Sequence, residues 1–296
     1  MKFTNLVHGS TAAPALVTAE GIILLSALEA HRSGMKPLPT CMSELISAGD
    51  GMVKELSCLL DTLSSEALAS LYLDPAMVTY APVVTHPGKI LCVGLNYKSH
   101  TSEIQRDQPE TPVLFSKFNN TLAAHLQEIP LPSIAKYFDY EAELVIVMGK
   151  EAKAVSESDA LSYVYGYCIG NDLTARELQG LTSQWLLGKS LDNFGPVGPY
   201  LVTADEVGDP QDLHMCLELN GEMRQKAHTS EMIFSCAEII SYASKYITLM
   251  PGDIIYTGTT GGVIQGYPRE ERVWMKPGDE VVIRIDKLGE LKNRLI

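Results

Sequence analysis

The chain has 296 residues, of which 46% are hydrophobic and 20% charged, so it can bury a full core and is not disordered. Its net charge of −13 argues against nucleic acids and anionic membranes as partners, and no apolar run approaches the ~18 residues of a membrane span. The N-terminus lacks the apolar core of a secretory signal, and the six cysteines include no C-x-x-C pair. We therefore expect a cytoplasmic protein with reduced cysteines and with neither nucleic acid nor membrane as a partner.

The first 80 residues read as a small α+β domain. A short strand-like pattern around Leu6–Val7 is followed by a longer one over Ala15–Leu25, and apolar residues then recur at helical spacing over Met42–Leu63. The glycines of Gly49–Gly51 predict a break that divides this stretch into two helices. Prolines and a glycine over Asp74–Lys89 predict turns or a linker. No cluster of chemically reactive residues lies in this domain, so we expect it to serve packing.

Residues 81–296 read as a β-rich second domain, and we place the boundary near Tyr80. Two Pro-Gly-Asp turns, at 251–253 and 277–279, are each followed at once by a β run, which predicts strands of one curled sheet in an α+β fold. The predicted strands are Ile90–Val93, Leu144–Met148, Tyr163–Ile169, Leu213–Leu219, Asp253–Tyr256 and Val281–Ile285. The predicted helices are Ser156–Leu161, Thr174–Gly180 and Ser230–Lys245.

Three acidic residues lie at the ends of two of these predicted strands, two before the first strand and one after the second. Glu141 and Glu143 alternate at the start of one strand, so they share a face, and Asp172 follows the end of the next. Like charges this close are unfavourable unless a cation lies between them. An all-oxygen set without histidine or cysteine suits Mg²⁺, Mn²⁺ or Ca²⁺ and not Zn²⁺. The alternative is that the two glutamates are solvated charges at a strand start.

The helix predicted after Asp172 carries two polar side chains on one face. Thr174 and Glu177 have the spacing of a capping box, which would begin the helix beside the proposed metal ligand. Arg176 and Gln179 are three residues apart, so they could together grip a substrate carboxylate. The alternative is an ordinary surface helix.

A histidine–glutamate pair and a lysine are the remaining candidates for chemistry. His100 and Glu103 are three residues apart, so on a helical turn they can hydrogen-bond, which prepares the imidazole to deprotonate water. Lys189 follows an apolar stretch, and a metal-site carboxylate would be its natural partner. The alternatives are an exposed structural pair and a surface lysine.

The segment Pro87–Tyr97, followed by His100 and Glu103, resembles the start of the catalytic domain of the fumarylacetoacetate hydrolase family. The resemblance covers roughly residues 80–296, and the matching segments occur in the order of the family. The further matches are Asp139–Lys150, Gly166–Gln179, Gly188–Asp192, Gly198-Pro199, Leu219–Gln225, Met232–Ser235 and Gly252–Thr259.

This resemblance implies a mixed β-sandwich roll, usually in a homodimer, and a small N-terminal domain as in the bacterial and fungal two-domain members. It also implies a divalent cation, Mg²⁺ or Mn²⁺ with Ca²⁺ as an alternative, and an acid–base pair on a mobile segment. The implied metal ligands are Glu141, Glu143 and Asp172, the pair is His100 and Glu103, and Lys189, Arg176, Gln179 and Thr259 would face substrate or metal-bound water.

Two departures from the family pattern lie in the loop after Thr259. Thr260 stands where the family usually has proline, and Gly262-Val263-Ile264 stands where it often has Gly-Val-Gly. Because that loop borders the expected site, the departures bear on the choice of substrate.

The resemblance implies chemistry on 2-oxo or 1,3-dioxo acids, because a cation chelated by such an acid stabilises an enolate. With a water activated by His100, the expected reaction is hydrolysis of a C–C bond in an acylpyruvate-like or fumarylacetoacetate-like acid. Decarboxylation of an oxaloacetate-like acid, or isomerisation of an oxo acid, is the alternative on the same site. A ligand-binding homologue without catalysis is disfavoured because both His100 and Glu103 are present.

Overall fold

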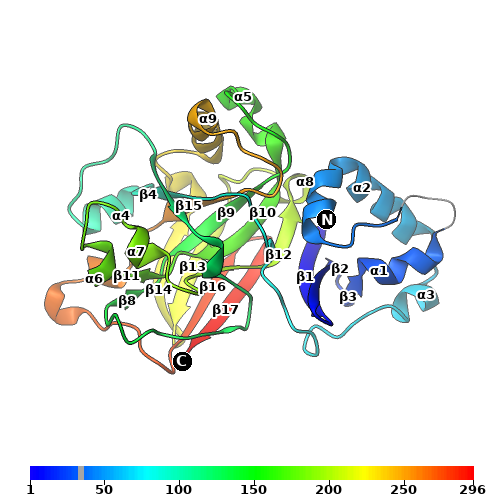
Figure 1. Cartoon of the computed structure of the whole chain (residues 1–296), viewed down its shortest axis with the longest axis horizontal. Coiled ribbons are helices and arrows are strands. Elements are labelled where there is room, and N and C mark those ends of the chain that lie inside the picture. The colour runs from blue at the N-terminus through cyan, green and yellow to red at the C-terminus, as the bar shows by residue number, and fades with distance from the viewer. Residues whose placement is uncertain (33–36) are drawn as a thin grey trace.

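The computed structural model describes residues 1–32 and 37–296, and Figure 1 shows them as a larger lobe and a smaller N-terminal lobe. The main sheet runs through both lobes in the order β3-β2-β1-β12-β10-β9-β15-β4-β5, with β6 pairing beside β12. Its strands are β1 (Lys2–His8), β2 (Thr11–Val17), β3 (Ile22–Leu24), β4 (Ile90–Gly94), β5 (Val113–Lys117), β6 (Leu122–Ala123), β9 (Ala142–Met148), β10 (Val164–Asn171), β12 (Gly195–Thr203) and β15 (Ile254–Thr259).

A second sheet packs against the first in the larger lobe and has the order β14-β13-β16-β17-β7. Leu144 and Ile146 of β9 share one buried cluster with Leu217 and Ile283 of the second sheet, so the core lies between the two sheets. Since β15 pairs parallel with β4 and antiparallel with β9, the sheet is mixed. The strands of the second sheet are β7 (Glu128–Ile129), β13 (His214–Leu219), β14 (Glu222–His228), β16 (Glu280–Ile285) and β17 (Gly289–Leu295).

Helices and one small strand pair surround these sheets (Figure 1). The strand pair is β8 (Phe138–Asp139) with β11 (Thr174–Ala175). The helices are α1 (Leu25–Leu28), α2 (Met42–Thr62), α3 (Ser65–Ala69), α4 (Lys98–Glu103), α5 (Glu157–Ala160), α6 (Arg176–Gln179), α7 (Leu186–Lys189), α8 (Ala204–Val207) and α9 (Cys236–Tyr246). Within the described ranges, no helix is long and apolar enough to cross a membrane.

Strand β9 is buried along its whole length because both of its faces are covered. Leu144 and Ile146 point into the core between the sheets, while Val145 and Val147 belong to a second core on the opposite face. This explains why the sequence is a continuous apolar run rather than an alternating one. The fold is therefore the β-rich α+β sandwich roll that the sequence predicts.

The N-terminal lobe is joined to the larger lobe by both a sheet and a core. Strand β1 pairs antiparallel with β12, with Lys2 opposite Val202 and Thr4 opposite Tyr200. Phe3 lies in the same buried cluster as Val145 of β9. The division into residues 1–80 and 81–296 stays a prediction about folding units.

The structure corrects two of the predicted elements and confirms a predicted break in a third. The single strand over Ala15–Leu25 is wrong, because a turn at residues 18–21 separates β2 from β3. The predicted break at Gly49–Gly51 is confirmed, because Gly49 has the non-helical φ of 63° and ψ of −157° and so divides α2 into two helical parts. The helix over Ser230–Lys245 is also wrong at its start, because a capping box of Ser235 and Glu238 begins α9 at Cys236.

Candidate active site

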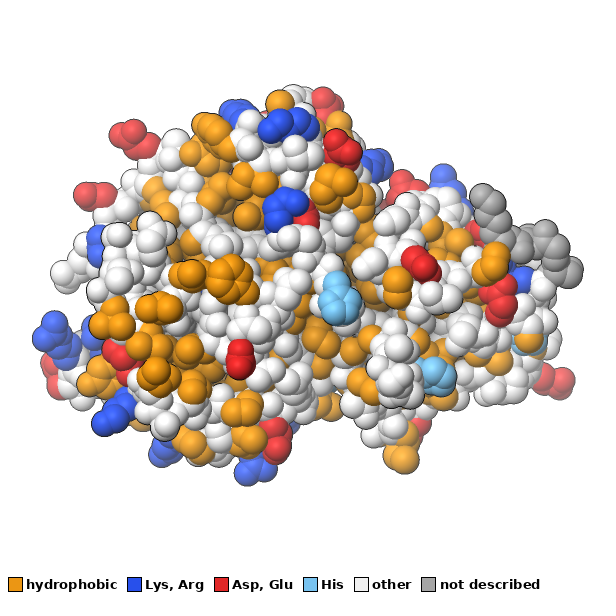
Figure 2. Space-filling view, viewed as in Figure 1, with side chains coloured by type: hydrophobic (Ala, Val, Ile, Leu, Met, Phe, Trp, Pro, Cys, Tyr) orange, Lys and Arg blue, Asp and Glu red, His pale blue; other side chains and the backbone are white. Residues whose placement is uncertain are grey.

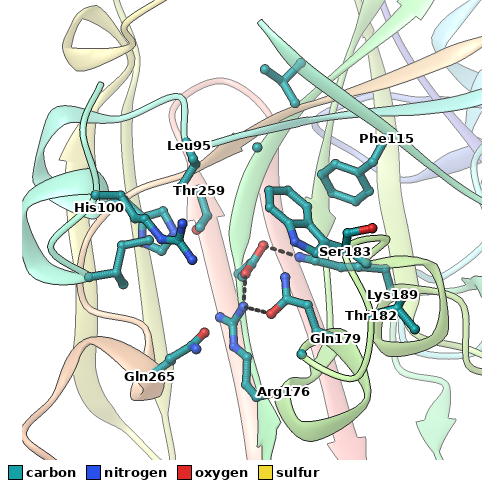
Figure 3. A pocket seen from close by; sticks show the side chains of 17 residues that line it. Leu95, His100, Phe115, Arg176, Gln179, Thr182, Ser183, Lys189, Thr259 and Gln265 are labelled. Carbon is teal, nitrogen blue, oxygen red and sulfur yellow. Dashed lines mark hydrogen bonds and ion pairs between the residues drawn. The ribbon is translucent and has the colours of Figure 1, made fainter. Parts of the chain in front are cut away.

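A cavity of about 590 Å³ lies beside the ends of β4, β9 and β15 in the larger lobe (Figure 3). In Figure 3, Lys189 and Arg176 converge on one carboxylate, while His100 and Thr259 lie on the other side of the cavity. The cavity is thus built from segments far apart in the sequence. The predicted site residues that line it are His100, Glu141, Arg176, Gln179, Lys189 and Thr259.

The three predicted metal ligands meet because of the antiparallel pairing of β9 with β10. Glu143 lies opposite Gly170, so the start of β9, preceded by Glu141, meets the end of β10, followed by Asp172. Each of the three carboxylates offers an oxygen within 4.8 Å of the others. All three side chains are buried, so the alternative of solvated charges at a strand start is wrong.

Three cationic side chains surround this carboxylate cluster. The Lys189 Nζ lies 2.7 Å from Glu141 Oε2 and 2.6 Å from Asp172 Oδ2. The Lys117 Nζ lies 2.6 Å from the other Asp172 oxygen, and an Arg176 nitrogen lies 2.8 Å from Glu141 Oε1. Lys189 is 2% exposed, so the alternative of a surface lysine is wrong, and its pairing with a carboxylate of the cluster agrees with the expectation.

The two glutamates respond oppositely to this environment. Burial would raise the pKa of Glu141, but Lys189 and Arg176 outweigh burial and lower its pKa to about 2. Burial raises the pKa of Glu143 well above its ordinary value, and the nearby charges of Asp172 and Glu141 raise it further. Within the described residues Glu143 forms no ion pair, and only the amide of Gly258 donates to its Oε2, at 2.6 Å.

These contacts fit a divalent cation. The cluster offers only oxygen donors, which Mg²⁺, Mn²⁺ and Ca²⁺ prefer, and the cationic side chains leave one carboxyl group, Glu143, without a counter-charge. The three carboxylates can therefore hold a divalent metal.

The predicted histidine–glutamate pair forms on α4 and is not an exposed surface pair. The His100 Nδ1 lies 2.8 Å from Glu103 Oε1, and His100 is only 7% exposed. The other oxygen of Glu103 accepts a hydrogen bond from the Gly262 amide at 2.7 Å. With Nδ1 held by the glutamate, the Nε2 of the imidazole is the atom left for chemistry in the cavity.

Residues of the loop that departs from the family pattern hold α4 in place. The hydroxyl groups of Ser99 and Thr260 lie 3.1 Å apart, a contact that proline at position 260 could not make. Gly262 has a φ of 102°, and a Cβ there would lie 2.1 Å from the carbonyl oxygen of Arg224, so only glycine fits beside Glu103.

The expected capping box beside Asp172 is wrong. Thr174 and Ala175 form β11, which pairs with β8, so the backbone is extended there and α6 begins only at Arg176. The Thr174 hydroxyl donates to the Asp172 carbonyl at 2.9 Å, and Glu177 accepts from the Tyr137 amide at 3.0 Å instead. Strand pairing thus overrides the local helix signal.

Arg176 is held by carboxylates of the protein itself. Its Nε donates to Asp139 Oδ2 at 2.8 Å, its terminal nitrogens also contact Asp139 and Glu141, and a terminal nitrogen donates to Gln179 Oε1 at 3.1 Å. The bond to Gln179 leaves the amide nitrogen of Gln179 pointing into the cavity (Figure 3). The Thr259 hydroxyl donates to the Ala142 carbonyl and accepts from Gln225. That these side chains bind substrate stays a prediction, and the arrangement favours Gln179 over Arg176.

Two functional neighbours escaped the sequence reasoning. Lys117 ends β5 and is 3% exposed, and the only signal for it is a lone lysine at the end of a strand. Asp139 binds Arg176 and accepts from the amides of Ile264 and Gln265, so it joins α6 to the loop beside the dyad. Asp139 stands within the family-like segment but carries no spacing signal of its own.

Replacing Lys117 by methionine is expected to lower the free energy of unfolding by about 3 kcal/mol, because one oxygen of the buried Asp172 loses its counter-charge. Urea unfolding in the presence of a chelator measures this change. The matched control is Lys245→Met on the exposed end of α9, for which we expect less than about 0.5 kcal/mol. Equal stability of the two variants would contradict the role given to Lys117.

Comparison with known proteins agrees with this architecture. The model of the fumarylacetoacetate (FAA) hydrolase C-terminal family matches residues 89–296. The chain is 38% identical over 278 residues to a mitochondrial oxaloacetate tautomerase of Bos taurus, across 93% of this chain and 84% of the relative. It is 46% identical over 226 residues to the fumarylacetoacetate hydrolase domain-containing protein 2 homolog of Dictyostelium discoideum, across 73% of each.

Solved structures resemble the whole chain. A putative HpcE protein from Mycobacterium smegmatis superposes with a TM-score of 0.83 at 33% identity, covering 100% of this chain and 99% of the other. Maleylpyruvate hydrolase from Sphingobium sp. SYK-6, in complex with manganese(II) ion and pyruvate, superposes with a TM-score of 0.80 at 29% identity and the same coverage. The chain is therefore an enzyme of the fumarylacetoacetate hydrolase family.

Proposed function

We propose that this enzyme is a divalent-metal-dependent oxaloacetate tautomerase, which interconverts the keto and enol forms of that acid. The observation that carries the proposal is that His100, with Glu103 behind it, lines the same cavity as Glu141, which belongs to the carboxylate cluster with Glu143 and Asp172. The family acts on oxo acids, and the relatives aligned across 93% of this chain include several named oxaloacetate tautomerases.

The metal would be held by Glu141, Glu143 and Asp172, and Mg²⁺ or Mn²⁺ suits their oxygen donors, with Ca²⁺ as an alternative. A bound divalent cation would polarise the 2-oxo group and so acidify the neighbouring carbon. The solved maleylpyruvate hydrolase is in complex with manganese(II) ion and pyruvate, which supports a divalent metal and an oxo acid as ligands of this enzyme.

The proton transfer falls to the pair on α4. Tautomerisation removes a proton from C3 of the keto acid and delivers a proton to the 2-oxo oxygen, so no atom is gained or lost. The Nε2 of His100 accepts the C3 proton and then donates a proton to the 2-oxo oxygen, and Glu103 at 2.8 Å from Nδ1 stabilises the imidazolium that forms between the two transfers. The ammonium of Lys189 and the amide nitrogen of Gln179 favour negative charge on the substrate oxygen.

Hydrolysis of a C–C bond in a 1,3-dioxo acid is the second candidate, and it was the first expectation from the sequence. The same Nε2 of His100 could deprotonate a water instead of C3. The resemblance to maleylpyruvate hydrolase over the whole chain favours this candidate, whereas the greater identity to the tautomerases favours the first. Decarboxylation of oxaloacetate would use the same site, and a binder without catalysis is disfavoured by the intact pair.

One set of assays tests the proposal. The enzyme with Mn²⁺ is added to freshly dissolved enol-oxaloacetate, the loss of enol absorbance is followed, and pyruvate is measured in the same sample. We expect metal-dependent ketonisation that a chelator abolishes and that runs faster than pyruvate formation. Cleavage of an acylpyruvate without any ketonisation would overturn the proposal in favour of hydrolysis.

The proposal extends to a homodimer that binds a small oxo acid in the cytoplasm, whereas the oxaloacetate tautomerases of Bos taurus and Homo sapiens are named as mitochondrial. Figure 2 shows hydrophobic side chains gathered on the part of the larger lobe where Figure 1 places α6, α7, β8 and β11. Large exposed apolar residues in and beside these elements support an interface there: Leu187 of α7, Leu181 between α6 and α7, and Ile134 and Tyr137 before β8.

A further inference from the structure

One arginine of the cavity has a free guanidinium. Arg106 lines the same cavity as His100 and Lys189 and is exposed to solvent. Across residues 1–32 and 37–296, its side chain takes part in no ion pair and no hydrogen bond. Arg176 and Lys117, by contrast, already form ion pairs with buried carboxylates. Arg106 is thus a cation of the cavity that is available to a ligand.

The backbone holds Arg106 close to the catalytic pair. After α4, the Ile104 amide donates to the His100 carbonyl, and the Arg106 amide donates to the Thr101 carbonyl at 2.9 Å. Gln105 between them has a φ of 55°, so the chain reverses as it does at the end of many helices. Arg106 is therefore attached to the same turn that carries His100, and it keeps its place relative to the imidazole whenever α4 is in place.

The charges of the cavity decide what Arg106 can bind. The inner end is occupied by the carboxylate cluster and by cations already paired with it, whereas Arg106 stands at the solvent-exposed side. A planar guanidinium without a partner matches a carboxylate through two parallel hydrogen bonds. An oxo acid whose first carboxylate and 2-oxo group lie at the carboxylate cluster would direct a second carboxylate outward.

We propose that Arg106 binds the distal carboxylate of the substrate and so selects dicarboxylic over monocarboxylic 2-oxo acids. The proposal rests on the proposed function in that both place a 2-oxo acid in this cavity. It makes Arg106 a specificity-determining residue, while proton transfer stays with His100. Replacing Arg106 should therefore lower kcat/KM for substrates with two carboxylates and leave kcat/KM for those with one carboxylate nearly unchanged.

The test compares Arg106→Gln with wild type on two four-carbon acids, oxaloacetate and 2-oxobutanoate, by following exchange of the C3 protons in D₂O with saturating Mn²⁺. We expect kcat/KM for oxaloacetate to fall about 10–100-fold, mostly through KM, and that for 2-oxobutanoate to change less than about twofold. Arg106→Lys should recover part of the loss. The matched control Arg269→Gln removes another exposed arginine, outside this cavity, and should change neither value.

A binding measurement separates this proposal from the proposed function. Malate and 2-hydroxybutanoate are titrated into the Mg²⁺-loaded protein, and we expect Arg106→Gln to weaken the binding of malate alone. That result supports Arg106 even if wild type exchanges no C3 protons, in which case only the tautomerase proposal fails. Equal losses on both acids, or no loss on either, would overturn the role of Arg106.

Discussion

Replacing His100 by asparagine is expected to lower kcat for tautomerisation by about 10²–10⁴-fold, the usual contribution of a general base. The buried imidazole of His100 on α4 lines the cavity, and its Nδ1 is hydrogen-bonded to Glu103. The side chain of asparagine cannot accept the C3 proton in its place. Because the candidate metal ligands are Glu141, Glu143 and Asp172 and do not include His100, the Mn²⁺ affinity of the variant should stay within about twofold of that of wild type. Stopped-flow ketonisation gives the rate, and calorimetry gives the affinity.

The matched control for this variant is His214→Asn, since His214 is exposed on β13 and lies outside the cavity. It should leave both the rate and the metal affinity unchanged. A near-normal rate in the His100 variant would show that the histidine is structural and that the base lies elsewhere. A rate loss accompanied by an equal loss of metal affinity would instead mean that the variant disturbs the carboxylate cluster.

Replacing Glu143 by glutamine is expected to reduce Mg²⁺ and Mn²⁺ affinity by at least about 100-fold and to abolish metal-dependent activity, because one of three anionic donors is lost. The same change should stabilise the metal-free protein at neutral pH by about 1–3 kcal/mol, since it removes repulsion from Glu141 and Asp172. Calorimetry measures the first effect, and urea unfolding with a chelator measures the second.

The raised pKa of Glu143 gives this prediction a pH dependence. A carboxyl group whose pKa is higher in the folded state contributes stability that is fully present below its ordinary pKa of 4.5 and is lost as pH rises toward the folded value. Metal-free wild type should therefore lose stability over that range, whereas Glu143→Gln should lose less. At pH values at which Glu143 of the metal-free protein is still protonated, metal binding to wild type should also release a proton, which calorimetry in buffers of different ionisation enthalpy detects.

The exposed Glu151 supplies the control, because it follows the opposite end of β9 and lies outside the carboxylate cluster, so Glu151→Gln should change neither property. Metal affinity that survives in Glu143→Gln would remove Glu143 from the ligand set. Stability of the metal-free variant that falls at neutral pH would show that the glutamate is charged and paired in wild type.

The sequence alone was enough to predict the features that depend only on residues close together along the chain. Alternation in a strand puts Glu141 and Glu143 on one face, and three-residue spacing puts His100 beside Glu103, whatever the rest of the fold does. The apolar runs likewise identify β9, β10 and β15, because burial on both faces requires continuous hydrophobicity. The family motifs added the order in which these pieces occur.

The tertiary structure decided which charges face each other. Lys117 reaches Asp172, 55 residues later in the chain, only because β5 and β10 belong to one sheet. Arg176 pairs with Asp139 only because β8 pairs with β11. The same pairing replaced the expected cap at Thr174 with an extended segment. Local spacing determines which side chains are neighbours along one helix or strand. The register between strands, which the packing of the whole sheet sets, determines the counter-ion of each carboxylate and therefore which carboxyl group is left for a metal.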